Sequence, residues 1–246
     1  MPIKAVLFDV GDTLWYSTGV PPSEIRRNSA ERVGQALESL GLRTEAEPEA
    51  VARCAWDSIE LAVESARAGS LEEPDYVSAA QSALRGLGLE LDRRQAEQIL
   101  DATYVSGTVG GKSAFPDARS TLEEFRRRGF KLAIVTNRAF GGDRFRSDLR
   151  ETGLDVDWDA QAVSVEVGYL KPHPAMFEWV LDKLEIGADE ALMVGDSLKE
   201  DVAGARALGI HTVWLRSEPD AGGVRPDHTV DGLDGLLDLA LLRSPA

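Results

Sequence analysis

The feature that most constrains the fold is residues 4–14, where a short apolar run ends abruptly in an Asp-Val-Gly-Asp-Thr segment. An apolar run of this length, bounded by turn residues, is typical of a buried central strand in a parallel sheet. In open α/β sheets, ligands bind just beyond the carboxyl ends of the strands. Although most aspartates after a strand are turn residues or helix caps, we therefore expect Asp9 at the floor of an active site.

The size and charge of the chain narrow its class. Its 246 residues, of which 43% are hydrophobic, are expected to form one large domain or two small ones around a substantial core. The formal net charge of −15 argues against nucleic acid and anionic membrane as partners, because neither is attracted to an acidic surface. A solvated acidic surface explains most of this charge.

Cysteine and histidine residues are sparse. Cys54 has no partner for an internal disulfide, and the three histidines lack the close spacing of metal ligands, so no zinc site is expected. No signal-type apolar segment precedes the first expected strand, and no stretch approaches the roughly 18 consecutive apolar residues that span a bilayer. The expected compartment is therefore the reducing cytoplasm.

Helical periodicity dominates the region that follows the first strand. Apolar positions recur there at helical spacing, and glycines end the periodic segments. The expected helices cover residues 24–40, 49–67, 76–84 and 93–105, and no convincing strand lies among them. This pattern predicts a small helical module inserted after the first strand.

From Pro116 onward, helices and strands alternate. The expected strands are residues 131–136, 162–167, 191–194, 210–215 and, at the edge, 229–230; the expected helices are residues 117–128, 142–151, 174–184, 199–208 and 233–242. Such alternation implies an α/β fold, with a parallel sheet covered by helices on both faces. We therefore divide the chain into an α/β core, residues 1–16 and 113–246, and a helical domain, residues 17–112.

Reactive side chains follow several of the expected strands. They are Asp9, Thr136 with Asn137, Lys171, and Asp196 with Asp201. Each has an ordinary explanation by itself, as a turn residue, a helix cap or a surface lysine. Because the carboxyl ends of parallel strands meet at one edge of a sheet, their common placement favours a single active site.

Motifs around these residues resemble a known family. They are residues 8–14 (FDVGDTL), 134–137 (IVTN), 171–174 (KPHP), and 194–197 (VGDS) with Asp201 and 204–209 (GARALG). In this order and at these spacings they resemble the haloacid dehalogenase (HAD) superfamily, whose members are mostly magnesium-dependent phosphatases. The resemblance covers nearly the whole chain. It implies a Rossmann-like HAD core, with the first-motif strand at its centre, and an inserted, mobile four-helix cap.

The resemblance also implies a nucleophile and a metal site. Asp9 would attack phosphorus to give an aspartyl-phosphate. Mg²⁺ would be bound by the carboxylates of Asp9 and Asp196 and by the backbone carbonyl of Gly11, since oxygen ligands suit this hard ion. Cations are required because two unit negative charges about 4 Å apart repel by on the order of 4 kcal/mol at an effective dielectric constant near 20.

The remaining motif residues would bind and orient the phosphoryl group. Lys171 would be the second cation, and Thr136 would donate a hydrogen bond to a phosphoryl oxygen, assisted by backbone N–H groups around Val10 and Asn137. Asp201 would orient the water molecules bound to the metal. The resemblance further implies a small phosphorylated metabolite as substrate and a monomer or homodimer as the assembly.

One position departs from the family pattern. Phosphatases of the family usually carry a second aspartate two residues after the nucleophile, where it protonates the leaving group and then activates water. Gly11 occupies that position here, and the aspartate follows one residue later, as Asp12. General acid-base catalysis contributes about 10² to 10⁴ in rate, so this change predicts a slow phosphatase. Asp12 is a poor replacement, because neighbouring residues in an extended chain point to opposite sides.

Three interpretations follow. The chain is a phosphatase whose leaving group needs little protonation, or one that recruits a base from Asp12, the cap or the substrate. Alternatively, it is a haloacid dehalogenase, a branch that also lacks the second aspartate, although the retained Asp196 speaks against this. The third alternative is a non-catalytic or weakly active binding protein. The four motif residues that are retained speak against it: Asp9, Thr136, Lys171 and Asp196. We favour the phosphatase.

Substrate choice in capped members of this family depends on the cap and on the loop after the first strand. Candidate residues here are Trp15, Tyr16 and residues 17–22. Arg138, beside the second motif, is a candidate for binding a second anionic group of the substrate. The alternative for Arg138 is a solvated surface arginine.

Overall fold

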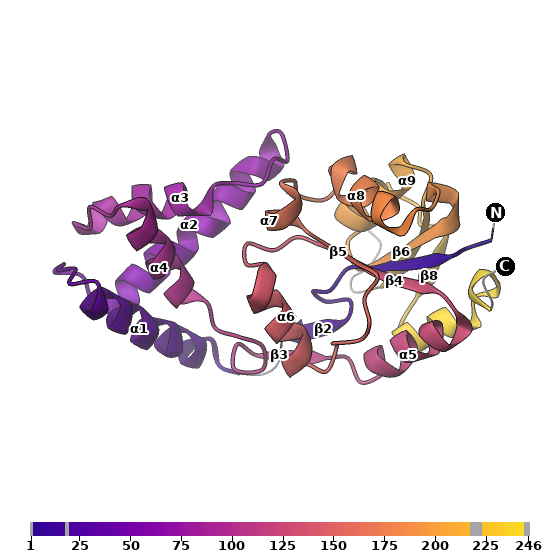
Figure 1. Cartoon of the computed structure of the whole chain (residues 1–246), viewed down its shortest axis with the longest axis horizontal. Coiled ribbons are helices and arrows are strands. Elements are labelled where there is room, and N and C mark those ends of the chain that lie inside the picture. Colours follow the sequence, from indigo (N-terminus) through magenta and orange to yellow (C-terminus); the bar gives the residue numbers. More distant parts are fainter. Residues whose placement is uncertain (1, 18–19, 217–222, 244–246) are drawn as a thin grey trace. The chain divides into compact units, whose positions relative to one another are not determined.

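The computed structural model describes residues 2–17, 20–216 and 223–243, which belong to two compact units (Figure 1). The first, here called the sheet unit, comprises Met1–Ser17 and Lys112–Ala246. The second, here called the helical unit, comprises Thr18–Gly111. That the helical unit acts as a mobile cap stays a prediction.

The sheet unit contains a six-stranded sheet in which neighbouring strands are parallel. The strand order is β5-β4-β1-β6-β7-β8, with β1 Ala5–Phe8, β4 Lys131–Thr136, β5 Ala160–Val163, β6 Ala191–Gly195, β7 His211–Leu215 and β8 His228–Val230. At the end of β1, Phe8 lies opposite Ile134 of β4 on one side and Val194 of β6 on the other. The predicted Rossmann-like α/β fold, with the first-motif strand inside the sheet, is confirmed.

Helices cover both faces of this sheet. They are α5 Ala118–Arg128, α6 Gly142–Glu151, α7 Ser164–Val167, α8 Pro174–Leu184 and α9 Ala203–Ala207, with the shorter turns η2 Ala188–Glu190, η3 Leu198–Val202, η4 Leu233–Asp238 and η5 Ala240–Leu242. Val6 and Phe8 pack with residues of α5, whereas Ala5 and Leu7 pack with residues of α8. Since successive strand residues point to opposite faces and both faces are covered, β1 is apolar throughout.

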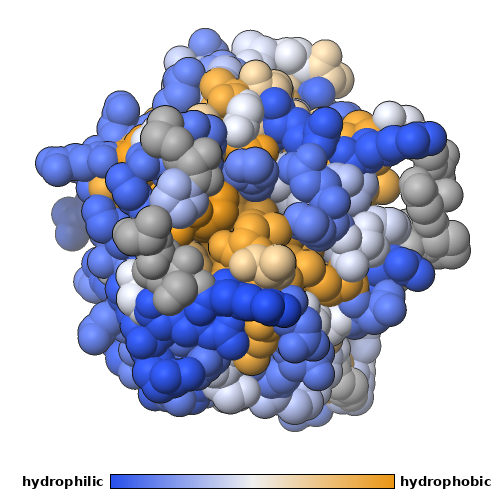
Figure 2. All heavy atoms as spheres, turned by 90° about the vertical axis from the view of Figure 1, so that its right-hand side faces the viewer, coloured by the Kyte–Doolittle hydropathy of each residue, from blue (hydrophilic) through white to orange (hydrophobic). Residues whose placement is uncertain are grey.

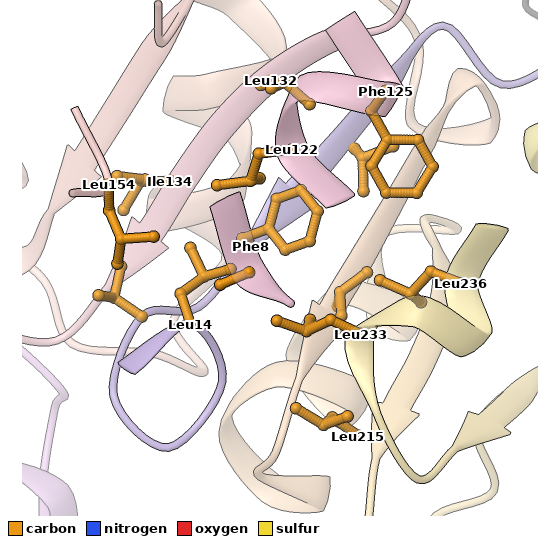
Figure 3. Packing of buried hydrophobic residues seen from close by; sticks show 14 of the residues in the cluster. Phe8, Leu14, Leu122, Phe125, Leu132, Ile134, Leu154, Leu215, Leu233 and Leu236 are labelled. Carbon is orange, nitrogen blue, oxygen red and sulfur yellow. The ribbon is translucent and has the colours of Figure 1, made fainter. Parts of the chain in front are cut away.

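The core beneath α5 is organised around Phe8 (Figure 3). Its ring centroid lies 6.3 Å from that of Phe125 and 6.3 Å from that of Trp158. The ring of Phe125 in turn meets Phe130 edge-on, at 5.7 Å. Because Phe8 immediately precedes Asp9, this packing fixes the strand end from which the candidate nucleophile projects.

The helical unit consists of the predicted helices, whose type and approximate bounds are confirmed. They are α1 Pro22–Ser39, α2 Pro48–Ala68, α3 Tyr76–Leu84 and α4 Arg93–Thr103, with the short turn η1 Arg85–Leu87 after α3. Proline lies in the first turn of α1 and of α2. It suits a helix start, because the backbone N–H that proline lacks would have no acceptor within the helix at that position. A capping box begins α4, where the side chains of Asp92 and Gln95 each accept the other's backbone N–H.

A short antiparallel strand pair was not predicted. β2, Trp15–Ser17, pairs with β3, Lys112–Ala114, and Ser17 lies opposite Lys112. Each strand has three residues, which is too short for alternation of polar and apolar residues to be recognisable. The pair lies where the chain leaves the sheet unit and returns to it.

Two segments were predicted wrongly. The strand expected at 162–167 ends at Val163, and Ser164–Val167 forms the helical turn α7, in which the buried Ser164 hydroxyl accepts the backbone N–H of Arg138. The helix expected at 233–242 is two 3₁₀ turns separated by Leu239, whose ψ of 126° is not helical. In both segments local hydrogen bonds and packing outweigh the apolar periodicity.

Hydrophilic residues dominate the face seen in Figure 2, and apolar residues show between them, most extensively near its centre. Within the described ranges, no helix combines the length and apolar character needed to cross a bilayer.

We expect Phe125→Ala to lower the free energy of unfolding by about 3–5 kcal/mol, because removing a fully buried phenyl ring leaves a cavity between Phe8 and Phe130. Chemical denaturation measures this change. Leu61→Ala is the control, since Leu61 is 66% exposed, and its effect should stay within about 0.5 kcal/mol. Equal effects of the two substitutions would contradict the packing described for Phe8.

Candidate active site

The loop after β1 presents Asp9 at the carboxyl edge of the sheet. The backbone N–H of Asp9 donates to the carbonyl of Val194 on β6 (2.9 Å), which extends the strand pairing by one residue. The carbonyl of Val10 then accepts the N–H groups of Leu14 (2.9 Å) and Trp15 (3.0 Å), so the chain turns back on itself at once. Asp9 is buried, with 8% of its surface exposed, and it lies at the start of this hydrogen-bonded turn.

The ammonium group of Lys171 joins two carboxylates. Its Nζ lies 2.6 Å from Oδ1 of Asp9 and 2.6 Å from Oδ1 of Asp201. Lys171 is only 2% exposed. Burial by itself would lower the pKa of Lys171, but the charges and hydrogen bonds of Asp201 and Asp9 hold that pKa above its ordinary value. Lys171 therefore carries a positive charge against the candidate nucleophile.

The side chain of Asn137 holds the backbone of Lys171. Its Oδ1 accepts the N–H of Lys171 (2.7 Å), and its Nδ2 donates to the carbonyl of Lys171 (3.3 Å) and to Oε2 of Glu200 (3.1 Å). Asn137 follows directly on β4, whose last residue is the buried Thr136. The second motif is thus fastened to the third through one amide side chain.

The turn after β6 brings Asp201 to the site. Asp201 lies in a π-helical turn, Leu198–Val202, and its Oδ2 accepts the backbone N–H of Ser197 (3.0 Å). A Cβ at position 195 would collide with the Asp201 carboxylate, which explains the glycine of the VGDS segment. Ser197 caps this turn, because its Oγ accepts the N–H of Glu200 (3.1 Å).

Asp196 completes a cluster of carboxylates. One ligand atom each from Asp9, Asp196 and Asp201 can be chosen so that all three lie within 4.8 Å of one another. Asp196 accepts a hydrogen bond from Thr13 (3.4 Å), and its backbone carbonyl accepts one from Nε1 of Trp214 (2.8 Å). The carboxylates of the cluster outnumber the ammonium group of Lys171, so the donor set fits a divalent cation.

Burial is the main cause of the raised pKa values in the cluster, and neighbouring negative charges add to it. Burial, reinforced by the charges of Asp9 and Asp12, raises the pKa of Asp196 from 3.8 to about 6. Burial also raises the pKa of Asp201, although Lys171 favours its charged form. Both oxygens of Asp201 already accept protein donors, so Asp9 and Asp196 are the better candidates for direct metal ligands.

One protein family matches most of the chain. The profile of the haloacid dehalogenase-like hydrolases matches residues 3–209. The chain belongs to the haloacid dehalogenase-like hydrolase family. The resemblance found in the four motifs is confirmed, and the chain is a hydrolase by family.

Curated relatives of the chain are phosphatases. The chain is 30% identical to the glyceraldehyde 3-phosphate phosphatase of Methanopyrus kandleri over 96% of this chain and 97% of the relative. It is 35% identical to the ribulose-1,5-bisphosphate 5-phosphatase of Halopiger xanaduensis, over 57% of this chain and 62% of the relative.

Solved structures of the family share the fold. A HAD phosphatase from Thermococcus onnurineus superposes with a TM-score of 0.59 at 25% identity, covering 96% of both chains. A 2-haloacid dehalogenase from Pseudomonas syringae superposes with a TM-score of 0.66 at 23% identity, covering 98% of both chains. At the latter identity, the likeness shows the fold alone.

The glycine that departs from the family pattern stands in open space. A Cβ built on Gly11 meets no heavy atom within 4 Å, and the φ of Gly11 is outside the left-handed region. The next residue, Asp12, is exposed and has a φ of 53°. Neither crowding nor backbone conformation therefore demands glycine at position 11. The metal role of the Gly11 carbonyl stays a prediction, as do the phosphate-binding roles of Val10, Thr136 and Asn137.

Arg138 is neither a solvated surface residue nor a free anion-binding group. Its Nη2 donates to Oδ2 of Asp148 (2.9 Å), and its guanidinium group lies over the rings of Trp15 and Phe145. The expectation that Arg138 binds a second anionic group is not supported by these contacts. Asp148 could not be recognised from the sequence, because its position on α6 gives no sign that its side chain is buried.

We expect Asp196→Asn to stabilise the metal-free protein at neutral pH. Because the pKa of Asp196 is raised on folding, the folded state binds more protons than the unfolded state between about pH 4 and pH 6, and this group lowers the free energy of unfolding as the pH rises through that window. In excess chelator, the variant should exceed the wild type by about 1–2 kcal/mol at pH 7, after allowance for solvent screening, and equal it near pH 4.

Urea denaturation at a series of pH values measures this difference. Asp157→Asn, at an exposed position of the same unit, should follow the wild type throughout. Parallel curves for wild type and Asp196→Asn from pH 4 to pH 7 would show that Asp196 carries no electrostatic penalty.

Proposed function

We propose that this chain is a magnesium-dependent phosphomonoester hydrolase that acts on a small phosphorylated metabolite through an aspartyl-phosphate intermediate. The observation that carries the proposal is the buried Lys171 ammonium, bonded to Asp9 beside a cluster of carboxylates that fits a divalent cation. The phosphatase relatives support the same reaction class.

Charge is the reason that this arrangement suits phosphoryl transfer. A carboxylate nucleophile and a phosphate about 4 Å apart repel by on the order of 4 kcal/mol at an effective dielectric constant near 20. Lys171 offsets part of this repulsion at Oδ1 of Asp9, and its position also suits a phosphoryl oxygen.

The carboxylates of Asp9 and Asp196 and the carbonyl of Gly11 would hold Mg²⁺. When bound, the ion would neutralise the excess negative charge of the cluster and of the phosphate. Asp201 would fix the Lys171 ammonium and orient the water molecules of the metal, because one of its oxygens accepts that ammonium and the other a backbone N–H.

Asp9 is the nucleophile of the proposed reaction. An Asp9 oxygen forms a bond to phosphorus as the bond from phosphorus to the ester oxygen breaks, and the leaving alkoxide takes its proton from solvent or from the substrate. Water then attacks phosphorus as the bond from phosphorus to the Asp9 oxygen breaks; the proton that the water loses passes to the released phosphate or to solvent, and the Asp9 carboxylate is regenerated. The Thr136 hydroxyl and the backbone N–H groups of Val10 and Asn137 would donate to the phosphoryl oxygens as negative charge develops there.

The glycine at position 11 also fits a second function, the binding of phosphate with little turnover. Without a proton-transfer group at that position, the leaving group departs unassisted. A phosphate-binding protein with little turnover fits this feature too. Turnover distinguishes the two, and a dehalogenase is disfavoured by the Asp196 carboxylate, which suits a metal.

The purified chain is expected to hydrolyse 4-nitrophenyl phosphate only with Mg²⁺, and Asp9→Asn should reduce the turnover at least about 10³-fold, because the nucleophile is lost. Release of 4-nitrophenolate measures this. Asp157→Asn is the matched control, an exposed aspartate given the same substitution. Unchanged turnover in excess chelator would overturn the metal assignment, and unchanged turnover in Asp9→Asn would overturn the nucleophile.

Gly11→Asp is expected to raise the turnover of an alkyl phosphate, whose leaving group needs a proton, by about 10-fold or more, because it supplies an acid where a side chain has room. Release of inorganic phosphate measures this. Gly11→Asn is the matched control, since it adds nearly the same volume without a transferable proton. A Gly11→Asp variant that folds and binds Mg²⁺ but is no faster than Gly11→Asn would show that proton transfer is not limiting.

A further inference from the structure

A second buried ionic cluster lies in the sheet unit, apart from the carboxylates of the site. Asp148, on α6, is fully buried, and its Oδ2 accepts Nη2 of Arg138 (2.9 Å) and Nζ of Lys112 (3.0 Å). The side chains of Arg138 and Lys112 are 15% and 20% exposed. A buried carboxylate is tolerated only when it is paired and hydrogen-bonded, so these contacts determine which way Asp148 faces.

Aromatic rings fix the guanidinium of Arg138 in the same place. Its central carbon lies 5.0 Å from the ring centroid of Trp15 and 4.9 Å from that of Phe145. The two rings themselves meet edge-on, at 6.1 Å. A planar cation held between rings and bonded to a buried carboxylate has little rotational freedom.

Arg138 is joined to the candidate active site through the backbone. It directly follows Asn137, and its own N–H donates to the Ser164 hydroxyl (2.9 Å). Asn137 in turn accepts the N–H of Lys171 and donates to the Lys171 carbonyl. A continuous set of contacts thus runs from α6 to the residue whose ammonium bonds to Asp9.

We propose that Asp148 is a positioning residue for the reaction: by holding Arg138, it fixes the loop that carries Asn137. That loop places the Lys171 ammonium against Asp9. The role in turnover rests on the proposed phosphatase function, whereas the role in fixing the loop does not. Asp148 touches none of the proposed reacting groups and acts only through this loop.

Asp148→Asn keeps the volume of the side chain and removes its charge. We expect kcat for 4-nitrophenyl phosphate to fall at least 10-fold, with KM changed less than threefold, because the phosphate-binding groups remain while the Lys171 ammonium is placed less accurately. Amide hydrogen exchange, followed by NMR, should accelerate at least 10-fold at Arg138 and Lys171, while the amide of Leu132 on β4 keeps its wild-type rate.

A double variant tests whether the effect of Asp148→Asn comes from the loss of the contact with Arg138 or from the excess positive charge that the single substitution leaves. Asp148→Asn leaves Arg138 and Lys112 without their carboxylate, whereas Asp148→Asn with Lys112→Met restores the net charge of the wild-type cluster. The double variant should show the same fall in kcat and the same local acceleration of exchange.

Glu124→Gln is the matched control. Glu124, on α5, also pairs with two arginines, Arg127 (2.6 Å) and Arg128 (2.8 Å), but its side chain is 23% exposed. Arg128 donates onward to the carbonyls of Leu237 (3.1 Å) and Leu242 (2.9 Å), not to the loop of the second motif. This variant should keep the wild-type kcat and the wild-type exchange rates at Arg138 and Lys171.

Two outcomes would overturn the proposal. One is a folded Asp148 variant with wild-type exchange at Arg138 and Lys171. The other is an acceleration of exchange that is uniform across the sheet unit, which would mean that Asp148 contributes to stability alone. If the wild type does not turn over the aryl phosphate, the phosphatase proposal fails, and the exchange rates still decide whether Asp148 fixes the loop.

Discussion

The structure depends on one buried ammonium group. Lys171 is enclosed almost completely, and such a charge is stable only where carboxylates meet it. Those carboxylates come from the loop after β1 and from the turn after β6, and the lysine comes from the loop after α7. The parallel order, with β1 next to β6, brings these segments to the same edge of the sheet. The fold and the candidate chemistry therefore have a common electrostatic requirement.

Much of this arrangement could be predicted because it is encoded locally. The strand Lys131–Thr136 and the helix Pro174–Leu184 have the predicted bounds, since the first is a bounded apolar run and the second begins at Pro174 and has a continuous apolar face. That Lys171 and Asp9 lie at one edge of the sheet could be predicted because parallel strands gather their carboxyl ends, whereas their direct pairing was implied only by the resemblance to the family. The chemical roles of these residues are proposals that the sequence and the geometry support together.

The remainder depends on contacts between distant residues that leave no periodic pattern in the chain. Trp15 pairs with Ala114, although the whole helical unit lies between these two residues in the sequence. Asp148 resembles any polar residue on a surface helix, and only the approach of Lys112 and Arg138 reveals that it is buried. The strand before Ser164 is shorter than predicted, because the Ser164 hydroxyl accepts the backbone N–H of Arg138 and the chain turns there into α7. Each case involves a tertiary interaction that overrides a local preference.

The pairing of Ser17 with Lys112 has a consequence for how such a chain can vary. Both attachment points of the helical unit are fastened side by side within the sheet unit, so the sheet tolerates an insert of almost any length between them. Loop closure depends only weakly on length, at about 0.6 kcal/mol for each doubling. The helical unit is thus an exchangeable module, whose size and surface can diverge while the sheet unit stays unaltered.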